Sequence, residues 1–444
     1  ILQWQNPYIC KFSLRFMETD HFKREDCRLC NGKNLEIAVS FEPVPVAGAF
    51  VREDQLDLEQ KLYPIDIWRC NSEDCGHFQL RDVVNPKILF PDDYSYFSGK
   101  SKEIREHFAV YAEKIAKKFS LDDKSFVVDV GSNDGTLLDF FKKQGVNKVL
   151  GVDPAANLAK YANDKGIETI AAMYDIKLAK KIKSERGPAD VVTANHVFAH
   201  TDDMIGMAKA VRELMHEKSI FTFEVSYFPD VLDKMLLGSI IHEHLCYHTV
   251  KPLAAFLERN DLELINIERT PIQGGSITCT AQVKRGSYKK SPVINDLIKM
   301  EEERGMYGSN PVGDFNKRLN KTKLETIDLI DKLAAEEKTI AGFGAARGGT
   351  LLNYHFGLGK HMKFIVDDDP DKQNMYSPGH HIKVYPTSKM YSERPDYVAV
   401  LAWVHSKPII KSHRKFLDEG GKFFTFLPEV QVIDKNNVDS YLSS

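Results

Sequence analysis

The chain has 444 residues, of which 43% are hydrophobic and 28% are charged, so it is too long for one compact core and two or three domains are expected. Its 60 basic and 63 acidic residues are spread along the chain, which argues against a protein that binds nucleic acid by neutralising phosphates. No apolar run is long enough to cross a membrane, and residues 1–20 lack the pattern of a secretory signal. We therefore expect a cytoplasmic protein.

Cysteines mark the beginning of the chain. Seven are present, an odd number that does not suggest a disulfide framework, and four of them form the pairs Cys27 with Cys30 and Cys70 with Cys75. Four thiolates satisfy a tetrahedral Zn²⁺ and leave no open position for catalysis. Because residues 20–90 have little helical or strand pattern, we predict a small irregular domain stabilised by structural zinc. Four unrelated reduced thiols are the alternative.

The middle of the chain alternates between strand and helix patterns. An amphipathic helix is predicted from Ser101, which is a good N-cap. Further helices are predicted near 137–143, 158–165, 204–215 and 252–259, and strands over 126–130, 148–152, 190–194 and 219–225. The segments 262–269 and 276–283 are predicted to form an antiparallel hairpin. This alternation predicts an α/β fold, a doubly wound sheet with the hairpin at its edge.

A polar helical region over 294–336 is expected to connect this sheet to a second α/β domain. In that domain we predict strands over 339–343, 362–366, 396–401 and 422–426, and helices over 348–356 and 407–418. The chain therefore contains two α/β units behind the cysteine-rich segment.

The strongest local signal is the apolar strand that runs into a glycine turn and a helix over 126–138. The spacing of Asp129, Gly131 and Gly135 is not that of a dinucleotide fingerprint, and an acid before the first glycine would repel a pyrophosphate but suits a ligand with an amino group. Asp153 ends the next strand, where it could accept hydrogen bonds from two ribose hydroxyls. The pattern indicates an S-adenosylmethionine site, and a strand–helix turn without a ligand is the alternative.

The ordered set of motifs resembles the S-adenosylmethionine-dependent C-methyltransferases that act on nucleotide-linked keto-deoxysugars. The similarity is carried by the N-terminal cysteines and by residues 89–98, 131–138, 195–200, 242–247, 273–276, 342–347 and 371–379. It covers nearly the whole chain. It implies a zinc-binding module over 1–90, a methyltransferase domain over 91–290 and a Rossmann-like domain over 291–444 that helps to close over the sugar nucleotide.

The cluster His242-Glu243-His244 could bind a divalent ion if it lay on a strand. However, the sulfonium methyl group is already activated, and methylation of carbon needs a base to remove a proton. We therefore favour His244 as the general base, with Glu243 orienting it or exchanging protons. Histidines that serve only local hydrogen bonds are a further alternative. The family pattern commonly has a tyrosine just before this cluster, whereas this chain has Ile241.

The resemblance implies further contacts to the substrate. It places His200 in the sugar pocket and a tyrosine of 89–98 against the sugar; between Tyr94 and Tyr96 we choose Tyr96 for the catalytic role and leave Tyr94 in substrate binding with His242. Arg347, which replaces the third glycine of a dinucleotide fingerprint, is expected to pair with a phosphate. The cofactor contacts that we predict are Asp129, Gly131, Asn133, Gly135, Asp153, Pro154 and Asn195.

These residues lead to a predicted C-methylation next to a keto group, in which a base forms an enolate and hydrogen-bond donors hold its oxyanion. Two alternatives come from other classes. One is an NAD-dependent sugar-nucleotide oxidoreductase that uses the glycine turn at 342–348, and the other is a non-catalytic, zinc-stabilised binding protein. The sequence does not identify the nucleotide, the sugar, the methylated carbon or the oligomeric state.

Overall fold

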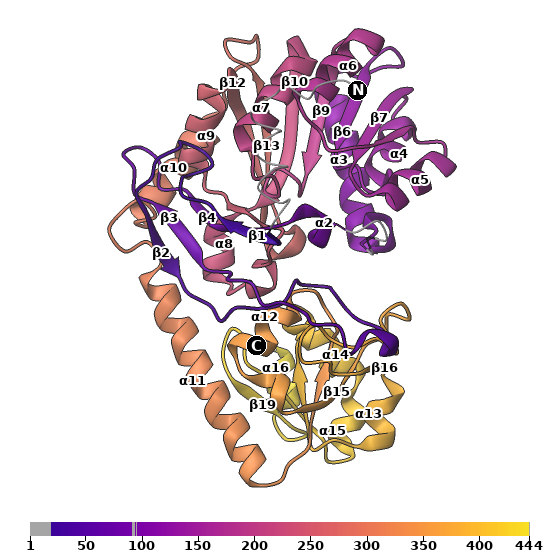
Figure 1. Ribbon diagram of the computed structural model, residues 1–444, viewed down its shortest axis with the longest axis vertical. Helices are drawn as coiled ribbons and strands as arrows, with labels where there is room; N and C mark the ends of the chain where they lie inside the picture. The colour runs from indigo at the N-terminus through magenta and orange to yellow at the C-terminus, as the bar shows by residue number, and fades with distance from the viewer. Residues whose placement is uncertain (1–18, 91–93, 95, 444) are drawn as a thin grey trace. The chain divides into compact units, whose positions relative to one another are not determined.

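The computed structural model describes residues 19–90, 94 and 96–443 (Figure 1). The chain divides into two compact units that are not continuous in sequence. Among the described residues, the first unit contains those from 19 to 38 together with those of Ile67–Asp230 and Glu243–Pro311. The second unit contains Val39–Asp66, Val231–His242 and the residues from Val312 onward. The boundaries predicted from the sequence, 1–90, 91–290 and 291–444, stay a prediction.

The first unit is built on a seven-stranded sheet with the order β12-β13-β10-β9-β6-β7-β8. Its strands are β6 (Phe126–Val130), β7 (Lys148–Asp153), β8 (Thr169–Ala171), β9 (Ala189–Asn195), β10 (Met215–Ser226), β12 (Leu262–Thr270) and β13 (Ser276–Val283). Strands β6 to β10 are parallel, whereas β13 runs antiparallel to β10 and to β12. The predicted doubly wound sheet with an edge hairpin is therefore confirmed.

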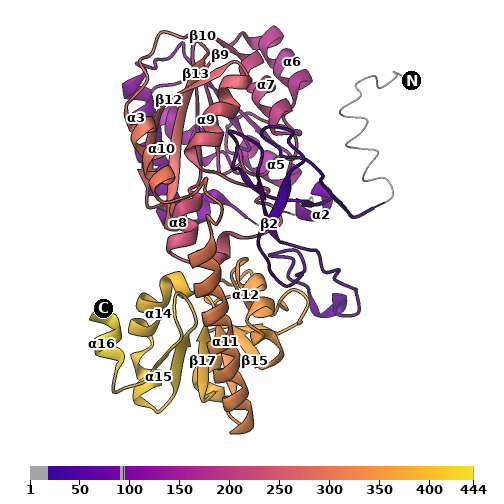
Figure 2. The ribbon, with the colours of Figure 1, turned by 90° about the vertical axis from the view of Figure 1, so that its left-hand side faces the viewer.

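Helices cover both faces of this sheet. Neighbouring residues of a strand point to opposite faces, so apolar residues in a row need a covering helix on each side. Val127 packs in a cluster with α3 and α4, whereas Val128 packs in a cluster with α6, α7 and α9. The helices of the unit are α3 (Lys102–Lys118), α4 (Thr136–Lys143), α5 (Ala156–Asp164), α6 (Ile176–Arg186), α7 (Met204–Leu214), α9 (Val250–Arg259) and α10 (Val293–Glu303), with α8 (Phe228–Asp233) at its margin. Figure 2 shows α3 and α7 on opposite sides of the strands.

The cysteine-bearing segment forms a small sheet of its own within the first unit. This four-stranded sheet has the order β11-β4-β3-β2 and consists of β2 (Leu35–Val39), β3 (Ile67–Cys70), β4 (Phe78–Leu80) and β11 (Cys246–Tyr247). A separate pair joins β1 (His21–Lys23) to β5 (Asp82–Val84), and the short helix α2 (Pro86–Leu89) follows. Strand β11 comes from a part of the chain far from the other three, directly after the histidine cluster.

The second unit has a six-stranded sheet with the order β16-β15-β14-β17-β18-β19. Its strands are β14 (Ile340–Phe343), β15 (Met362–Val366), β16 (Val384–Tyr385), β17 (Tyr397–Val400), β18 (Lys422–Thr425) and β19 (Gln431–Ile433), and its helices are α11 (Gly313–Ala335), α12 (Gly349–His355), α13 (Ser388–Glu393), α14 (Ser406–Ser412), α15 (Arg414–Asp418) and α16 (Val438–Ser443). Only β19 is antiparallel to its neighbour. The predicted Rossmann-like domain is therefore confirmed.

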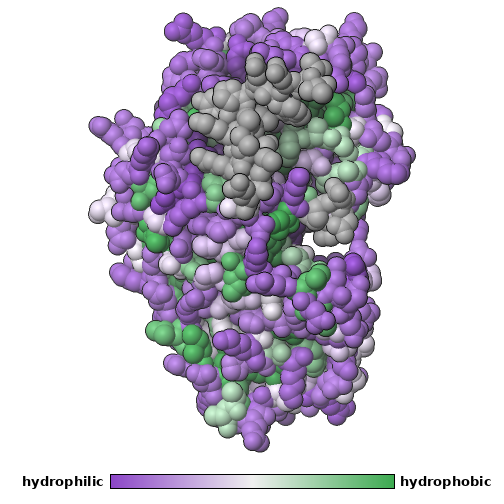
Figure 3. Space-filling view, in the orientation of Figure 1, coloured by the Kyte–Doolittle hydropathy of each residue, from purple (hydrophilic) through white to green (hydrophobic). Residues whose placement is uncertain are grey.

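The surface in the view of Figure 3 is mostly hydrophilic, and its hydrophobic positions are scattered. Within the part of the chain that the structure describes, no helix combines the length and the apolar character that a membrane span needs.

Candidate active site and zinc centre

The glycine turn after β6 lies where the strand order of the first sheet reverses, with β7 on one side and β9 on the other. Ligands of open α/β sheets bind at such a point. Gly131 and Gly135 have positive φ angles of 69° and 76°, and a Cβ on Gly131 would lie 2.3 Å from a methyl carbon of Val197. The turn can therefore approach a ligand with its backbone only as long as these positions are glycine.

Asp153, the last residue of β7, connects the glycine turn to the following loop. One carboxylate oxygen accepts a hydrogen bond from the backbone N–H of Asn133 at 2.8 Å, and the other accepts one from Ala155 at 2.9 Å. Pro154 lies between Asp153 and that loop residue. Burial raises the pKa of Asp153. A carboxylate has about four acceptor positions, so it can still accept from a ribose.

Asp129 is buried at the end of β6, where it accepts a hydrogen bond from the hydroxyl of Thr193 at 2.5 Å. Burial raises the pKa of Asp129 to about 7, since the charged carboxylate loses its hydration there. Asn195 ends the neighbouring strand β9. A cationic group of a ligand would favour the ionised form of Asp129, which agrees with the amino group expected from the sequence.

The segment before α3 lies against the glycine turn. The side-chain oxygen of Asn133 accepts from the N–H of Ser98 at 2.9 Å, and its amide donates to the carbonyl of Tyr96 at 3.0 Å. Asp134 accepts from the N–H of Gly99 at 2.9 Å. Sequence analysis missed Asp134, although its place between Asn133 and the second turn glycine was a signal.

Three segments that are distant in sequence bring their catalytic candidates together in the first unit. The rings of His200 and His244 are stacked with their centroids 5.0 Å apart, and the ring of Phe90 lies 6.4 Å from His200. The hydroxyl of Tyr94 lies 3.4 Å from a carboxylate oxygen of Glu243, so it can donate a hydrogen bond there. The structure thus places an acid, two imidazoles and a phenol beside one another.

The remaining predicted residues lie elsewhere. Tyr96 is 37% exposed, and its backbone carbonyl accepts a hydrogen bond from Asn133 of the glycine turn, whereas the hydroxyl of Tyr94 lies at Glu243. In the second unit, the Nε2 atom of His242 lies 3.3 Å from the carbonyl of Tyr63. In the same unit, the side chain of Arg347 occupies the space that a Cβ on Gly48 would fill.

A buried carboxylate that the sequence did not reveal lies at the ends of β9 and β10. Glu224 contacts Nε2 of His107 at 2.8 Å and Nε2 of His196 at 3.1 Å, and it accepts a hydrogen bond from the hydroxyl of Thr278 at 2.8 Å. Burial would raise the pKa of Glu224, but the hydrogen bonds and charges of His107 and His196 outweigh it and hold the pKa at about 2. No sequence motif could have found this group, because its members come from four different elements or loops.

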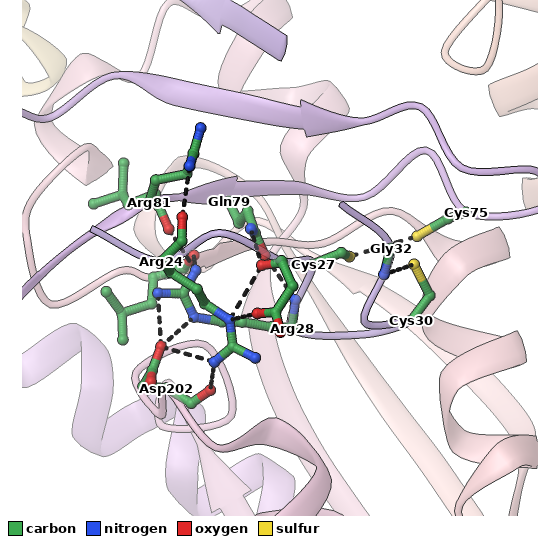
Figure 4. Close-up of polar contacts among 12 residues, drawn as sticks. Arg24, Cys27, Arg28, Cys30, Gly32, Cys75, Gln79, Arg81 and Asp202 are labelled. Atoms are coloured by element: carbon green, nitrogen blue, oxygen red, sulfur yellow. Dashed lines mark hydrogen bonds and ion pairs between the residues drawn. The ribbon is translucent and has the colours of Figure 1, made fainter. Parts of the chain in front are cut away.

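The four predicted metal ligands converge. The sulfur atoms of Cys27, Cys30, Cys70 and Cys75 all lie within 4.8 Å of one another, with 3.7 Å between Cys27 and Cys75 and 3.6 Å between Cys30 and Cys70. A tetrahedron with Zn–S bonds of about 2.3 Å has edges of roughly 3.8 Å, so the donor set fits zinc. The N–H of Gly32 donates to the sulfur of Cys30 at 3.3 Å (Figure 4), a contact typical of thiolate ligands.

Comparisons with known proteins identify the family. Family models match in chain order: a zinc binding domain over residues 27–90, a methyltransferase domain over 103–267 and a C-methyltransferase C-terminal domain over 271–428. The C-methyltransferase NovU from Streptomyces niveus is 30% identical over 410 residues, which cover 92% of this chain and 97% of that protein. This chain belongs to the C-methyltransferase family.

Solved structures of more distant methyltransferases also match. The S-adenosylmethionine-dependent methyltransferase from Anabaena variabilis is 14% identical, with 40% of this chain and 86% of that chain covered and a TM-score of 0.33. The CcbJ methyltransferase from Streptomyces caelestis is 13% identical, with 40% and 89% covered and a TM-score of 0.32.

The C-methyltransferase uses S-adenosylmethionine, and its N-terminal module is a zinc-binding domain. Family membership therefore favours methyl transfer over the NAD-dependent oxidoreductase and the non-catalytic binding protein that the sequence left open.

Proposed function

We propose that this C-methyltransferase methylates the carbon next to the keto group of a nucleotide-linked deoxysugar, through an enolate that a protein base generates. The observation that carries the proposal is the cluster of His200, His244, Glu243 and Tyr94 in the first unit, because it supplies a base together with hydrogen-bond donors. A cytoplasmic location, predicted from the sequence, belongs to the same proposal.

S-adenosylmethionine supplies an electrophilic methyl group on a sulfonium. His244 removes the proton that the neighbouring ketone makes acidic, and Glu243 holds the imidazole in place or receives its proton. The ring of His200 is stacked on that of His244 and the hydroxyl of Tyr94 lies at Glu243, so we assign His200 and Tyr94 to the enolate oxygen. Asp129 and Asp153, together with the glycine turn, hold the cofactor.

Arg347 and His242 belong to the second unit, where we assign them to the nucleotide-sugar substrate. Arg347 carries a planar cation with several donors, which suits a diphosphate. In the second unit the turn amide of Ala345 donates to Asp367 at 2.6 Å, so this carboxylate already serves the glycine turn. That contact gives Asp367 a role without a nicotinamide cofactor.

The test uses purified protein, S-adenosylmethionine and a panel of nucleotide-linked keto-deoxysugars. We expect S-adenosylhomocysteine to form in equal amount to a product with a new C-methyl signal in its NMR spectrum. The paired variants Tyr94→Phe and Tyr96→Phe decide which phenol takes part, and we expect Tyr94→Phe to lower turnover more. Formation of an O-methyl product, or of no product with any keto sugar, would refute the proposal.

A further inference from the structure

A buried arginine links the zinc-binding segment to the histidine cluster. Arg28 lies between Cys27 and Cys30 in sequence, and its side chain is 0% exposed. Two nitrogens of its guanidinium, Nε and one terminal nitrogen, each lie 3.0 Å from the same carboxylate oxygen of Asp202 (Figure 4). Asp202 follows His200 by two residues, so this ion pair fastens the loop that carries His200 to the cysteine segment.

The same guanidinium reaches the second catalytic segment. Its other terminal nitrogen donates to the carbonyl of Leu80 in β4 and lies 3.4 Å from the carbonyl of Leu245, the residue after His244. The N–H of Leu80 donates to that Leu245 carbonyl at 3.0 Å. Arg28 therefore contacts both catalytic loops, one directly through an ion pair and the other through the edge of the small sheet.

Backbone contacts join the two loops to each other and fix the arginine. The N–H of Cys246 in β11 donates to the carbonyl of Ala199 at 3.1 Å. The N–H of Arg28 donates to the side chain of Gln79 at 2.9 Å, and the Gln79 amide donates to the carbonyl of Asp26 at 3.0 Å. The position of Arg28 is thus fixed by the cysteine segment and by β4, while its charged end lies at the catalytic loops.

Stability alone does not explain this ion pair. Removing two charges from water is costly, and apolar residues of similar volume often stabilise a buried site as well or better. What an apolar pair cannot supply is direction, because a guanidinium has five donors in a fixed plane and can hold several acceptors at set positions. The arrangement suits a device that sets the geometry of the loops.

We propose that Arg28 and Asp202 are positioning residues that hold His200 and His244 in their stacked arrangement, so that the zinc-binding segment sets the geometry of the catalytic base. The inference rests on the proposed function, because it assigns His244 to proton removal. Neither Arg28 nor Asp202 needs to touch the substrate. A shift of about 1 Å in a reacting group can lower a rate roughly a hundredfold, so a modest relaxation of the loops is sufficient.

The test compares Asp202→Asn and Arg28→Lys with the control Arg186→Gln. Asp202 also pairs with Arg24 at 3.1 Å, so Arg28→Lys isolates the contribution of Arg28. Arg186 forms an ion pair with Glu168 on the surface of the same unit and contacts neither loop. Zinc content and affinity for S-adenosylmethionine are measured for every variant.

The substrate is a nucleotide-linked keto-deoxysugar from the panel that the wild type methylates. For Asp202→Asn we expect kcat to fall about tenfold or more, with KM changed little. Exchange of the acidic proton of that substrate into heavy water should fall in parallel, because it reports proton removal without methyl transfer. Arg28→Lys should retain part of the activity, because the lysine amine can pair with Asp202. It cannot at the same time reach the carbonyls of Leu80 and Leu245. Zinc content, cofactor affinity and the control variant should match the wild type.

A second measurement does not depend on the substrate. Hydrogen exchange read by mass spectrometry should show faster exchange of residues 197–202 and 244–247 in both Asp202→Asn and Arg28→Lys. Strands β6 and β7 should keep the wild-type rates. Wild-type values of kcat, proton exchange and hydrogen exchange in a variant that keeps its zinc would overturn this inference and leave the proposed function standing. Loss of zinc or of cofactor binding in both variants would also overturn it, since the pair would then serve folding. A wild type that neither methylates nor deprotonates any keto sugar would overturn the proposed function, and the inference with it.

Discussion

Asp153 is the residue on which cofactor affinity should depend most. Its carboxylate holds the glycine turn through Asn133 and has acceptor positions left for a ribose, and a charge-assisted hydrogen bond contributes about 1.5–3 kcal/mol. Asp153→Ala should therefore weaken S-adenosylmethionine binding about tenfold or more in calorimetry. Asp164→Ala, on the exposed end of α5, is the matched control and should bind normally. Undiminished affinity in Asp153→Ala would remove this residue from the cofactor site.

His244 should determine proton removal. His244→Asn keeps a hydrogen-bonding side chain but loses the base, so turnover should fall roughly a hundredfold or more while cofactor affinity is retained. Exchange of the substrate proton into heavy water measures the loss directly. Ile241 is buried and can neither donate nor accept a hydrogen bond, so Ile241→Tyr tests whether a phenol before the cluster is limiting. Normal proton exchange in His244→Asn would exclude His244 as the base.

The buried carboxyl of Asp129 should make stability depend on pH. Burial raises its pKa to about 7 in the folded protein, whereas an unfolded chain has an ordinary value near 4. The folded state therefore binds the proton more tightly, and stability should fall as the pH rises from about 4 to about 7, by on the order of 1–4 kcal/mol in all.

Asp129→Asn keeps an acceptor for Thr193 and removes this titration. Urea unfolding of the cofactor-free protein should therefore show the variant gaining stability relative to the wild type as the pH rises. If the two proteins change in parallel, Asp129 is not the source of the dependence.

Local patterns explain which site residues the sequence could predict. Asp129 and Asp153 lie at the ends of strands and Gly131 directly follows one, so their positions at one edge of the sheet come from the strand pattern itself. The contacts of Tyr94 with Glu243 and of Arg28 with Asp202 join residues far apart in the chain, and one sequence has no signal for such pairs. The resemblance implies a tyrosine in this segment without deciding between Tyr94 and Tyr96, and the contact to Glu243 favours Tyr94.

Among the elements, those with strong periodicity were predicted and those with little buried surface were missed. β8 has only three residues, and α6 buries only Ala179 and Ile182. The predicted helix over 407–418 is divided at His413, whose ring nitrogen lies 2.9 Å from the hydroxyl of Tyr391. Short strands and a break within a helix leave almost no trace in apolar spacing.

The region predicted as a polar connector, 294–336, contains an element that closes the first unit. In α10, Glu301 is fully buried and accepts hydrogen bonds from the N–H of Val250 at 2.7 Å and of Lys251 at 3.3 Å, at the beginning of α9. The hydroxyls of Tyr227 and Tyr307 donate to the same carboxylate. A carboxylate from one helix thus caps the first turn of another.

Glu301→Gln should therefore destabilise the protein, because an amide offers one acceptor oxygen and no charge to four donors. We expect a loss of about 1–3 kcal/mol in the free energy of unfolding in urea. Glu302→Gln is the neighbouring control: Glu302 contacts the Lys251 side chain at the surface, and an exposed pair contributes at most about 1 kcal/mol. Equal stability of the two variants would contradict the capping role.

At the scale of the whole molecule, the compact units are not continuous stretches of the sequence. Residues 39–66 and 231–242 belong to the second unit although their neighbours in sequence belong to the first. Composition and turn signals divide a chain into consecutive pieces. They could therefore indicate the two α/β sheets, but not that 39–66 and 231–242 belong to a different unit from their sequence neighbours. Strand β11, which joins the small cysteine-bearing sheet from far along the chain, escaped prediction for the same reason.

Zinc should hold one part of the molecule rather than all of it. We expect about one zinc ion per chain in protein purified without added metal, and Cys70→Ser should lower this content strongly. Cys279→Ala is the control, because Cys279 is buried in β13 and lies outside the group of four sulfur atoms. Elemental analysis decides this part, and a zinc content near zero in the wild type would defeat the assignment.

Removal of the metal with a chelator should then loosen the first unit locally. Hydrogen exchange should accelerate first in residues 21–38 and 67–84, and next in the loops that Arg28 contacts, while β6 and β7 respond later. The six-stranded sheet of the second unit has its own buried core around Val398 and Phe423 and should keep its protection. Simultaneous loss of protection in both units would show instead that zinc stabilises the whole chain as one cooperative structure.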